Sequence, residues 1–345
     1  MNLGILGGGQ LGMMLCQAAS KLRVNSHIYT DSDDSPAIQF SNSNVIKSYD
    51  DFREIDNFIS GCDVITYEFE NIPFESLEYI NQKLKVHPSP KINFIIQDRL
   101  SEKKYVNQLG IPTVPFIEVN SSDEILELPN NYFPGILKTR RMGYDGKGQT
   151  VIDNPNQIIN INDNQYILEK KIDLKKEISV IGVRYIDGTL FTYQPIQNIH
   201  QNQILYKSSS PAQIDPKIYD QSIEWSKKII QSLEYVGVIC FEYFIDNNEK
   251  LYLNEIAPRV HNSGHLTIES YNISQFESHI RAVCNLNKIA PELINKSEMY
   301  NILGEEIEIY RKTSNSSPNE YFHDYYKKQA KAGRKMGHLT KIINS

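Results

Sequence analysis

The chain has 345 residues, of which 40% are hydrophobic and 23% charged, and its formal net charge is −6. This length predicts a globular protein of two or three domains. The negative charge disfavours a general attraction to nucleic acid or to an anionic membrane. Because the sequence contains neither a basic, apolar leader nor the ~18 consecutive apolar residues of a membrane helix, we expect a cytoplasmic protein. The four cysteines share no metal-ligand spacing and are expected to be small buried side chains.

The first 90 residues alternate between patterns typical of strands and of helices. The predicted elements, in chain order, are strand 2–6, helix 11–22, strand 25–30, helix 51–60, strand 63–69, helix 75–84 and strand 85–89. This alternation predicts a parallel, doubly wound sheet. Two helical segments follow, and the second ends at Gly110 and Pro112.

A glycine-rich turn, Gly7-x-Gly9-x-x-Gly12, follows the first strand, and Asp31 lies 19 residues beyond Gly12. This spacing matches a dinucleotide-binding fingerprint, in which an acidic residue contacts a ribose hydroxyl. An NAD(P)-dependent oxidoreductase is therefore one hypothesis, and a loop facing another ligand is the alternative.

Beyond residue 115 the pattern changes to strands joined by short turns. The Asp187-Gly188 pair predicts a hairpin. The other predicted elements are strands at 133–138, 148–152, 165–172 and 177–196, helices near 217–234 and 274–285, and a hairpin at 236–256.

A second glycine-rich loop, "ILKTRRMGYDGKGQTVI" at 136–152, lies between two strands and is followed by no helix. It is therefore neither a Walker loop nor a Rossmann turn. Its glycines and cations are typical of a flap that closes over phosphates, although an ordinary hairpin with solvated charges fits the loop equally well.

The 236–256 hairpin places two carboxylates on neighbouring strands. A turn near Asn247 and Asn248 brings Glu242 and Glu255 to nearly facing positions. Two carboxylates held close together repel unless one is protonated or both share a cation. Mg²⁺ fits this pair, because it binds one or two carboxylates together with phosphate oxygens. Two exposed edge-strand glutamates are the alternative.

Three further segments carry polar groups. "YILEKKIDLKKE" (166–177) predicts a strand leading into a linker with acidic residues, as expected for a nucleotide-binding segment or a solvated charge run. "APRVHNSGH" (257–265) offers donors suited to a small anionic substrate. "YYKKQAKAGRKMGH" (325–338) is a basic run that fits a phosphate grip, a nucleic-acid patch or a solvated tail.

Taken together, the chain resembles the N5-carboxyaminoimidazole ribonucleotide synthetases of purine biosynthesis, a family of ATP-grasp enzymes. The matching stretches include "GILGGGQLGMML", "DRLSEKKYVNQLGIPT", "KTRRMGYDGKGQ", "LNEIAPRVHNSGH" and "GRKMGH", in family order over nearly the whole length. The resemblance implies an α/β and α+β ATP-grasp fold. It divides the chain into a Rossmann-like N-terminal domain with a parallel sheet (1–95), an ATP-grasp domain (96–275, flap about 115–180) and a small, shortened C-terminal domain (276–345).

The resemblance also implies the chemistry. ATP and bicarbonate would give carboxyphosphate, which carboxylates 5-aminoimidazole ribonucleotide in a Mg²⁺-dependent homodimer. The implied ATP contacts are Arg99, Lys138, Gly143, Tyr144, Asp145, Gly146, Lys147, Gly148, Gln149, Glu169, Lys170, Lys171, Ile172, Glu177, His200, Asn254 and Glu255. The implied ribonucleotide or bicarbonate contacts are Gln10, Tyr144, Asp145, Arg259, His261, Asn262, Ser263, Lys327, Arg334 and Lys335. Lys138, Tyr144, Asp145, Arg259 and His261 are the implied catalytic residues, and Glu242 and Glu255 the implied metal ligands.

Two residue choices depart from the family pattern: Met142 stands where a glycine is usual, and "KAGRK" replaces "RPGRK". Besides the oxidoreductase, two rival hypotheses are a formate-dependent glycinamide ribonucleotide transformylase, which usually carries Glu at the position of Gln10, and a nucleotide-binding scaffold without turnover.

Overall fold

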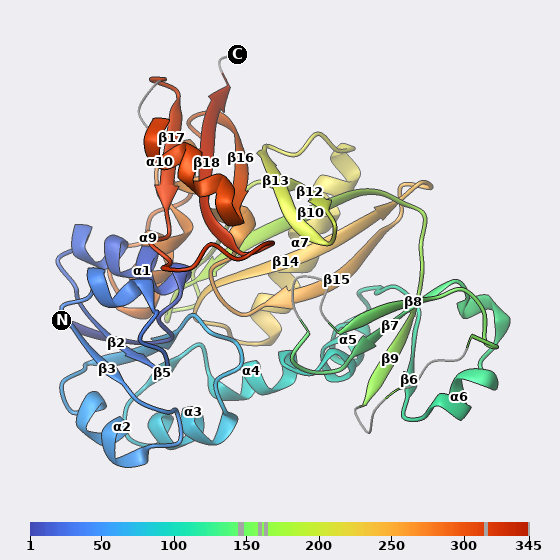
Figure 1. Cartoon of the computed structure of the whole chain (residues 1–345), viewed down its shortest axis with the longest axis horizontal. Helices are drawn as coiled ribbons and strands as arrows, with labels where there is room; N and C mark the ends of the chain where they lie inside the picture. The colour runs from blue at the N-terminus through green and yellow to red at the C-terminus, as the bar shows by residue number, and fades with distance from the viewer. Residues whose placement is uncertain (144–147, 158–160, 162–164, 314–316, 344–345) are drawn as a thin grey trace.

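The computed structural model describes residues 1–143, 148–157, 161, 165–313 and 317–343. Its described strands form three sheets, which Figure 1 shows as separate parts of the molecule. No helix within these residues is long and apolar enough to cross a membrane. The predicted Tyr144, Asp145, Gly146 and Lys147 lie outside the described residues.

The N-terminal sheet is parallel, with the strand order β3-β2-β1-β4-β5, which confirms the predicted doubly wound arrangement. Its elements are β1 (Asn2–Leu6), α1 (Gln10–Lys21), β2 (Asn25–Thr30), β3 (Ser43–Ile46), α2 (Phe52–Ile59), β4 (Val64–Tyr67), α3 (Phe74–Asn81) and β5 (Val86–His87). The edge strand β3 was not predicted, because it is mostly exposed and has no apolar alternation. The helices α4 (Pro90–Ile96) and α5 (Arg99–Gln108) match the two predicted segments.

A four-stranded antiparallel sheet follows, with the order β6-β9-β7-β8. Its strands are β6 (Phe116–Val119), β7 (Gly135–Thr139), β8 (Gln149–Ile152) and β9 (Tyr166–Lys170), and it also carries α6 (Ser122–Leu126). Buried Val119, Leu137 and Leu168 form a small apolar core with α6. β6 and α6 were not predicted. The predicted strand at 148–152 is β8, so the second glycine-rich loop joins β7 to β8.

The largest sheet has nine strands, and the C-terminal strands continue it rather than forming a sheet of their own. Its strands are β10 (Leu174–Arg184), β11 (Leu190–Thr192), β12 (Ile196–Gln201), β13 (Ile204–Ser210), β14 (Gly237–Asp246), β15 (Leu251–Ala257), β16 (Lys296–Leu303), β17 (Glu320–Asp324) and β18 (Lys335–Ile343). Its helices include α7 (Pro216–Ser232), α8 (Thr267–Ser270), α9 (Gln275–Val283) and α10 (Ile307–Thr313). The domain boundaries at 95 and 275 stay a prediction.

Two hairpin turns of this sheet differ in how easily they are predicted from their residue types. The Asp187-Gly188 turn between β10 and β11 was predicted and is confirmed. The turn between β12 and β13 was missed. It consists of Asn202 and Gln203 with positive φ angles of 50° and 66°, a conformation for which a glycine is the usual sequence signal.

The N-terminal sheet is joined to the large sheet through the buried imidazole of His279 on α9. Its Nε2 lies 2.8 Å from Thr66 Oγ1 on β4, and its Nδ1 accepts a hydrogen bond from Val238 N at 3.1 Å. This pairing requires the neutral ring, and burial lowers the pKa of His279 to about 3.

The stability of the fold should therefore fall in mild acid. Below the ordinary pKa near 6.5 the unfolded chain binds a proton at His279 that the folded chain excludes. Between pH 7 and pH 5 this single group should lower the free energy of unfolding by about 2 kcal/mol. Urea unfolding of the wild type and of His279→Gln at both pH values measures the difference, and equal pH slopes in the two proteins would contradict it.

Candidate active site

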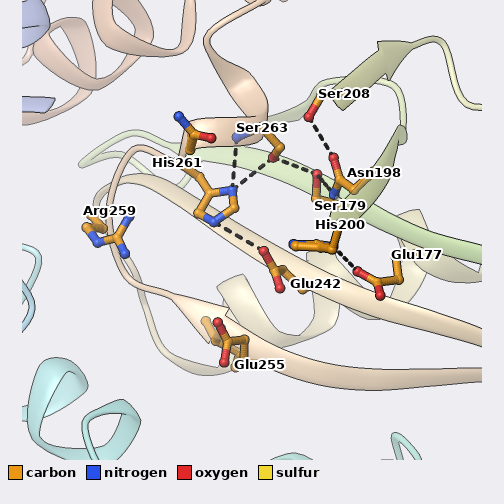
Figure 2. A network of polar contacts seen from close by, with 12 residues as sticks. Glu177, Ser179, Asn198, His200, Ser208, Glu242, Glu255, Arg259, His261 and Ser263 are labelled. Atoms are coloured by element: carbon orange, nitrogen blue, oxygen red, sulfur yellow. Dashed lines mark hydrogen bonds and ion pairs between the residues drawn. The ribbon is translucent and has the colours of Figure 1, made fainter. Parts of the chain in front are cut away.

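Two acidic side chains lie at paired positions on the β14–β15 hairpin. Glu242 and Glu255 are register partners, so the predicted facing arrangement is confirmed. Figure 2 shows both carboxylates on the same side of the hairpin. Glu242 Oε1 lies 3.2 Å from His261 Nε2, and Glu255 Oε2 accepts a hydrogen bond from Arg99 at 2.8 Å. Each carboxylate thus has its own basic neighbour.

The carboxyl group of Glu242 is ionised at neutral pH. Burial by itself would raise its pKa, but the hydrogen bond and charge of His261 outweigh burial and lower the pKa to about 2. A partly buried, ionised carboxylate that directly faces a second one favours a shared cation.

The donor set fits Mg²⁺. Besides the two carboxylates, Asn254 Oδ1 is buried without a hydrogen-bond partner in the described part of the chain, and an oxygen of this kind suits a hard cation. No group of three or more His, Cys, Asp or Glu side chains that could hold a metal occurs among the described residues. Mg²⁺ commonly takes its remaining ligands from phosphate and water.

A chain of buried polar groups fixes the ring of His261. His261 Nδ1 lies 2.8 Å from Ser263 Oγ, Ser263 Oγ lies 2.7 Å from Ser179 Oγ on β10, and Asn198 on β12 donates to Ser179 at 3.1 Å. The chain is visible in Figure 2, where it ends at Ser208. The backbone N–H of Ser263 also lies 3.3 Å from Nδ1, so Ser263 holds that edge of the ring through both its backbone and its side chain, and Nε2 faces Glu242.

Two buried lysines flank Glu169 on β9. Lys138 Nζ on β7 lies 2.8 Å from Glu169 Oε2, and Lys103 Nζ on α5 lies 3.0 Å from Glu169 Oε1. Burial would raise the pKa of Glu169, but the two lysines outweigh it and lower the pKa to about 2. Lys138 and Glu169, both predicted nucleotide contacts, are therefore brought together.

The residues at both ends of the glycine-rich flap, next to β7 and in β8, are held by side-chain contacts. Arg140 forms a two-pronged contact with Asp98, at 3.1 and 2.7 Å, and Gln149 donates to Gln203 at 2.8 Å. Met142 has a φ of 63°. This left-handed conformation favours glycine, which agrees with the usual family residue at that position.

His200 on β12 and Glu177 on β10 form an ion pair (Figure 2). Burial alone would lower the pKa of His200, but the hydrogen bond to Glu177 and the charge of Glu177 raise it. Glu177 was expected where the linker ends and the 177–196 strand begins, and this is corrected: it lies inside β10, because the strand already begins at Leu174. The linker is shorter and contains Lys171 and Ile172, whereas Lys170 ends β9.

The loop after β15 is held by internal contacts. Arg259 forms an ion pair with Glu70, beyond the end of β4. The side-chain amides of Asn262 and Asn301 bond reciprocally, at 3.1 and 2.6 Å. Both Asn262 and Ser263 are buried, so in this structure their side chains shape the loop. His261 faces Glu242, whereas Arg259 is paired with Glu70.

The first glycine loop is occupied by the buried side chain of Glu68. The backbone N–H of Gly9, at the start of α1, donates to Glu68 Oε1 at 2.6 Å. Gly7 has a φ of 108°, and a Cβ there would lie 2.8 Å from the same oxygen. In a dinucleotide enzyme the pyrophosphate occupies this helix N-terminus. The side chain of Glu68 fills this place instead, which argues against the oxidoreductase hypothesis.

The C-terminal basic run reaches this same loop. Lys327 Nζ donates to Gln10 Oε1 at 2.5 Å and to the carbonyl of Lys335 at 2.6 Å. Arg334 lies 3.4 Å from Asp34 Oδ2. Residues separated by 300 or more positions in the sequence are therefore brought together.

Glu68, Glu102 and Lys103 were missed by the sequence reasoning, and all three are buried in the described site. One signal was present for Lys103: Arg99, Glu102 and Lys103 have the spacing that places them on one face of a helix. Glu68 had no comparable signal, because its burial depends on a loop 59 residues away.

Comparisons with known proteins agree with this geometry. The chain matches the ribonucleotide synthetase pre-ATP-grasp domain over residues 1–97, the ATP-grasp domain over 104–276, and the phosphoribosylaminoimidazole carboxylase C-terminal domain over 297–345. It is 39% identical to an N5-carboxyaminoimidazole ribonucleotide synthase of Staphylococcus aureus strain MRSA252, covering 99% of this chain and 93% of that protein. A Brucella melitensis protein of the same name is 38% identical over 99% of this chain and 96% of its own length.

Solved structures lead to the same family. The Staphylococcus aureus N5-carboxyaminoimidazole synthetase complexed with ADP has a TM-score of 0.92 and 36% identity, covering 100% of this chain and 93% of that one. The Aspergillus clavatus enzyme in complex with ADP and 5-aminoimidazole ribonucleotide has a TM-score of 0.91 and 30% identity, covering 99% and 93%. The chain therefore belongs to the N5-carboxyaminoimidazole ribonucleotide synthase family of ATP-grasp enzymes.

Proposed function

We propose that this protein uses ATP and bicarbonate to carboxylate 5-aminoimidazole ribonucleotide, giving N5-carboxyaminoimidazole ribonucleotide, ADP and phosphate. The observation that carries the proposal is the paired placement of Glu242 and Glu255 in a chain whose family relatives bind ADP and the aminoimidazole ribonucleotide. The rival transformylase hypothesis has no support among these relatives.

The proposed chemistry needs charged groups around the transferring phosphoryl group. Bicarbonate is a poor electrophile, so its oxygen first attacks the γ-phosphorus of ATP, ADP leaves, and the resulting carboxyphosphate is a mixed anhydride. The amine of the ribonucleotide then attacks the carboxyl carbon of carboxyphosphate. The new C–N bond forms as the C–O bond to phosphate breaks, and phosphate leaves with the electron pair and takes up the amine proton. In the alternative route, carboxyphosphate first splits into phosphate and CO₂, and the amine attacks the CO₂ and gives its proton to the phosphate. Mg²⁺, held by Glu242 and Glu255, would neutralise charge on the transferring phosphoryl group.

Roles for the other residues follow from their chemistry. Lys138 and the flap, Gly143–Gln149, would bind the nucleotide phosphates. Arg259 and His261 would orient bicarbonate against the amine. Gln10, Lys327, Arg334 and Lys335 would bind the ribonucleotide and its phosphate, because a basic run beside the first glycine loop can neutralise that dianion.

The decisive assay is acceptor-dependent ATP turnover. ADP release by the purified protein with Mg²⁺ and bicarbonate is expected to rise when 5-aminoimidazole ribonucleotide is added. Glycinamide ribonucleotide with formate serves as the matched alternative acceptor. Stimulation by that pair instead would favour the transformylase, and ATP binding without turnover would favour a scaffold.

A homodimer and a cytoplasmic location belong to the same proposal, as expected for this family of biosynthetic enzymes. Light scattering coupled to size-exclusion chromatography measures the oligomeric state directly.

A further inference from the structure

The side chains of β14 and β15 do not follow one simple alternation. On β14, Phe241 and Tyr243 face an apolar core, and Glu242 between them faces the opposite side. On β15, Leu253 and Ile256 pack into that same core although they are three residues apart. Strict alternation from Leu253 would turn Glu255 into the core and Ile256 away from it.

A β-bulge at Asn254 resolves this conflict. Glu242 pairs with Glu255, but the next residue of β14, Tyr243, pairs with Leu253. Asn254 is therefore an extra residue on β15, and one extra residue reverses which face the following side chains occupy. The bulge is what places Glu255 beside Glu242.

Two side chains of α5 hold the backbone on both sides of the bulge. Lys103 Nζ donates to the carbonyl of Asn254 at 3.1 Å, and Glu102 Oε1 accepts from the N–H of Ile256 at 2.6 Å. Arg99, one turn earlier on the same helix, binds the carboxylate of Glu255. One helix face thus contacts three consecutive residues of β15.

These contacts supply hydrogen-bond partners for the outer backbone groups of an edge strand. β15 is the last strand in the order of its sheet, so its outer N–H and C=O groups need other partners. Thr113 forms an isolated β-bridge with Leu253. The N–H of Leu253 donates a hydrogen bond to the carbonyl of Pro112 at 2.9 Å. Beyond Leu253, buried Glu102 and Lys103 provide the partners that a neighbouring strand would otherwise supply.

We infer that Glu102 and Lys103 are positioning residues that hold the Asn254 bulge and thereby keep Glu255 aligned with Glu242 for metal–nucleotide binding. The inference rests on the proposed function of these two glutamates. Neither Glu102 nor Lys103 is assigned to ligand contact; both act through the backbone of β15.

The test is direct binding of Mn²⁺ to the full chain in the presence of ADP, followed by Mn²⁺ electron paramagnetic resonance. Glu102→Met removes the acceptor, whereas Glu102→Gln keeps an oxygen for the N–H of Ile256. We expect Glu102→Met to weaken Mn²⁺ binding by about 10–100-fold and Glu102→Gln by less than about threefold. If Glu102→Met does not fold, Glu102→Asp, which shortens the reach by one methylene, replaces it.

Ile256→Val is the matched control. It removes one buried methyl group at the same place, which should lower the free energy of unfolding by about 0.5–1.5 kcal/mol, and it leaves the backbone N–H unchanged. Its Mn²⁺ affinity should equal that of the wild type. Unchanged binding in Glu102→Met, equal losses in Met and Gln variants, or a similar loss in Ile256→Val would overturn the inference. If Glu255→Gln loses Mn²⁺ binding and Glu102→Met keeps it, only the positioning role of Glu102 is wrong. If Glu255→Gln binds Mn²⁺ as tightly as the wild type, the assignment of Glu255 as a metal ligand is wrong.

Discussion

Replacing Glu255 with glutamine is expected to abolish ATP turnover. A neutral amide has the shape of the carboxylate but cannot replace its charge opposite Glu242, and it also weakens the contact with Arg99. Changes to residues that merely orient metal ligands cost about 10–100-fold, so loss of a ligand itself should lower kcat by at least about 100-fold. Steady-state ADP release with saturating 5-aminoimidazole ribonucleotide measures the loss.

The control for this variant is Glu249→Gln on the same hairpin. Glu249 lies in the turn between β14 and β15, is largely exposed and pairs only with Lys175 among the contacts described for it. Its replacement should leave turnover unchanged. Near-normal activity in Glu255→Gln would refute the metal assignment.

Replacing Glu169 with glutamine should instead cause a large loss of stability. The variant leaves Lys103 and Lys138 buried without the carboxylate between them. Removing one partner from a buried ion pair typically costs about 3–5 kcal/mol. Urea unfolding at pH 7 measures the change in the free energy of unfolding.

The same variant has a predictable pH signature. The pKa of Glu169 is lowered to about 2 in the folded chain, so its contribution is fully present above the ordinary value near 4.5 and is lost as the pH falls toward 2. The wild type should therefore lose stability across this range more steeply than Glu169→Gln.

Glu118→Gln on the neighbouring strand β6 is the matched control for Glu169→Gln. Glu118 is partly exposed and paired with Arg140, so its removal should cost no more than about 1 kcal/mol. Equal losses in the two variants would contradict the role of the buried lysines.

The sequence predicted the features that depend on neighbours along the chain. Asp187 and Gly188 identify their turn because few other residues adopt its backbone angles. Glu242 and Glu255 could be paired because a short hairpin turn determines which residues face each other. The alternation of β1, α1 and β2 similarly indicated a parallel sheet.

Predictions failed where the local signal was weak. β3 is too exposed to show an apolar pattern, and the turn at Asn202 and Gln203 has positive φ angles without glycine. The start of β10 was placed at Glu177 instead of Leu174, because a run of charged residues hides it.

By itself, the amino-acid sequence determined the alternation of the first 90 residues, the opposed pair of acids and the family pattern of motifs, since each depends on residue type and short-range spacing. Tertiary structure alone decided that Glu68 occupies the first glycine loop, that Glu169 lies between Lys103 and Lys138, and that α5 holds the bulge at Asn254. These contacts join segments far apart in the chain, and a buried charge acquires its partner only when packing excludes water around both.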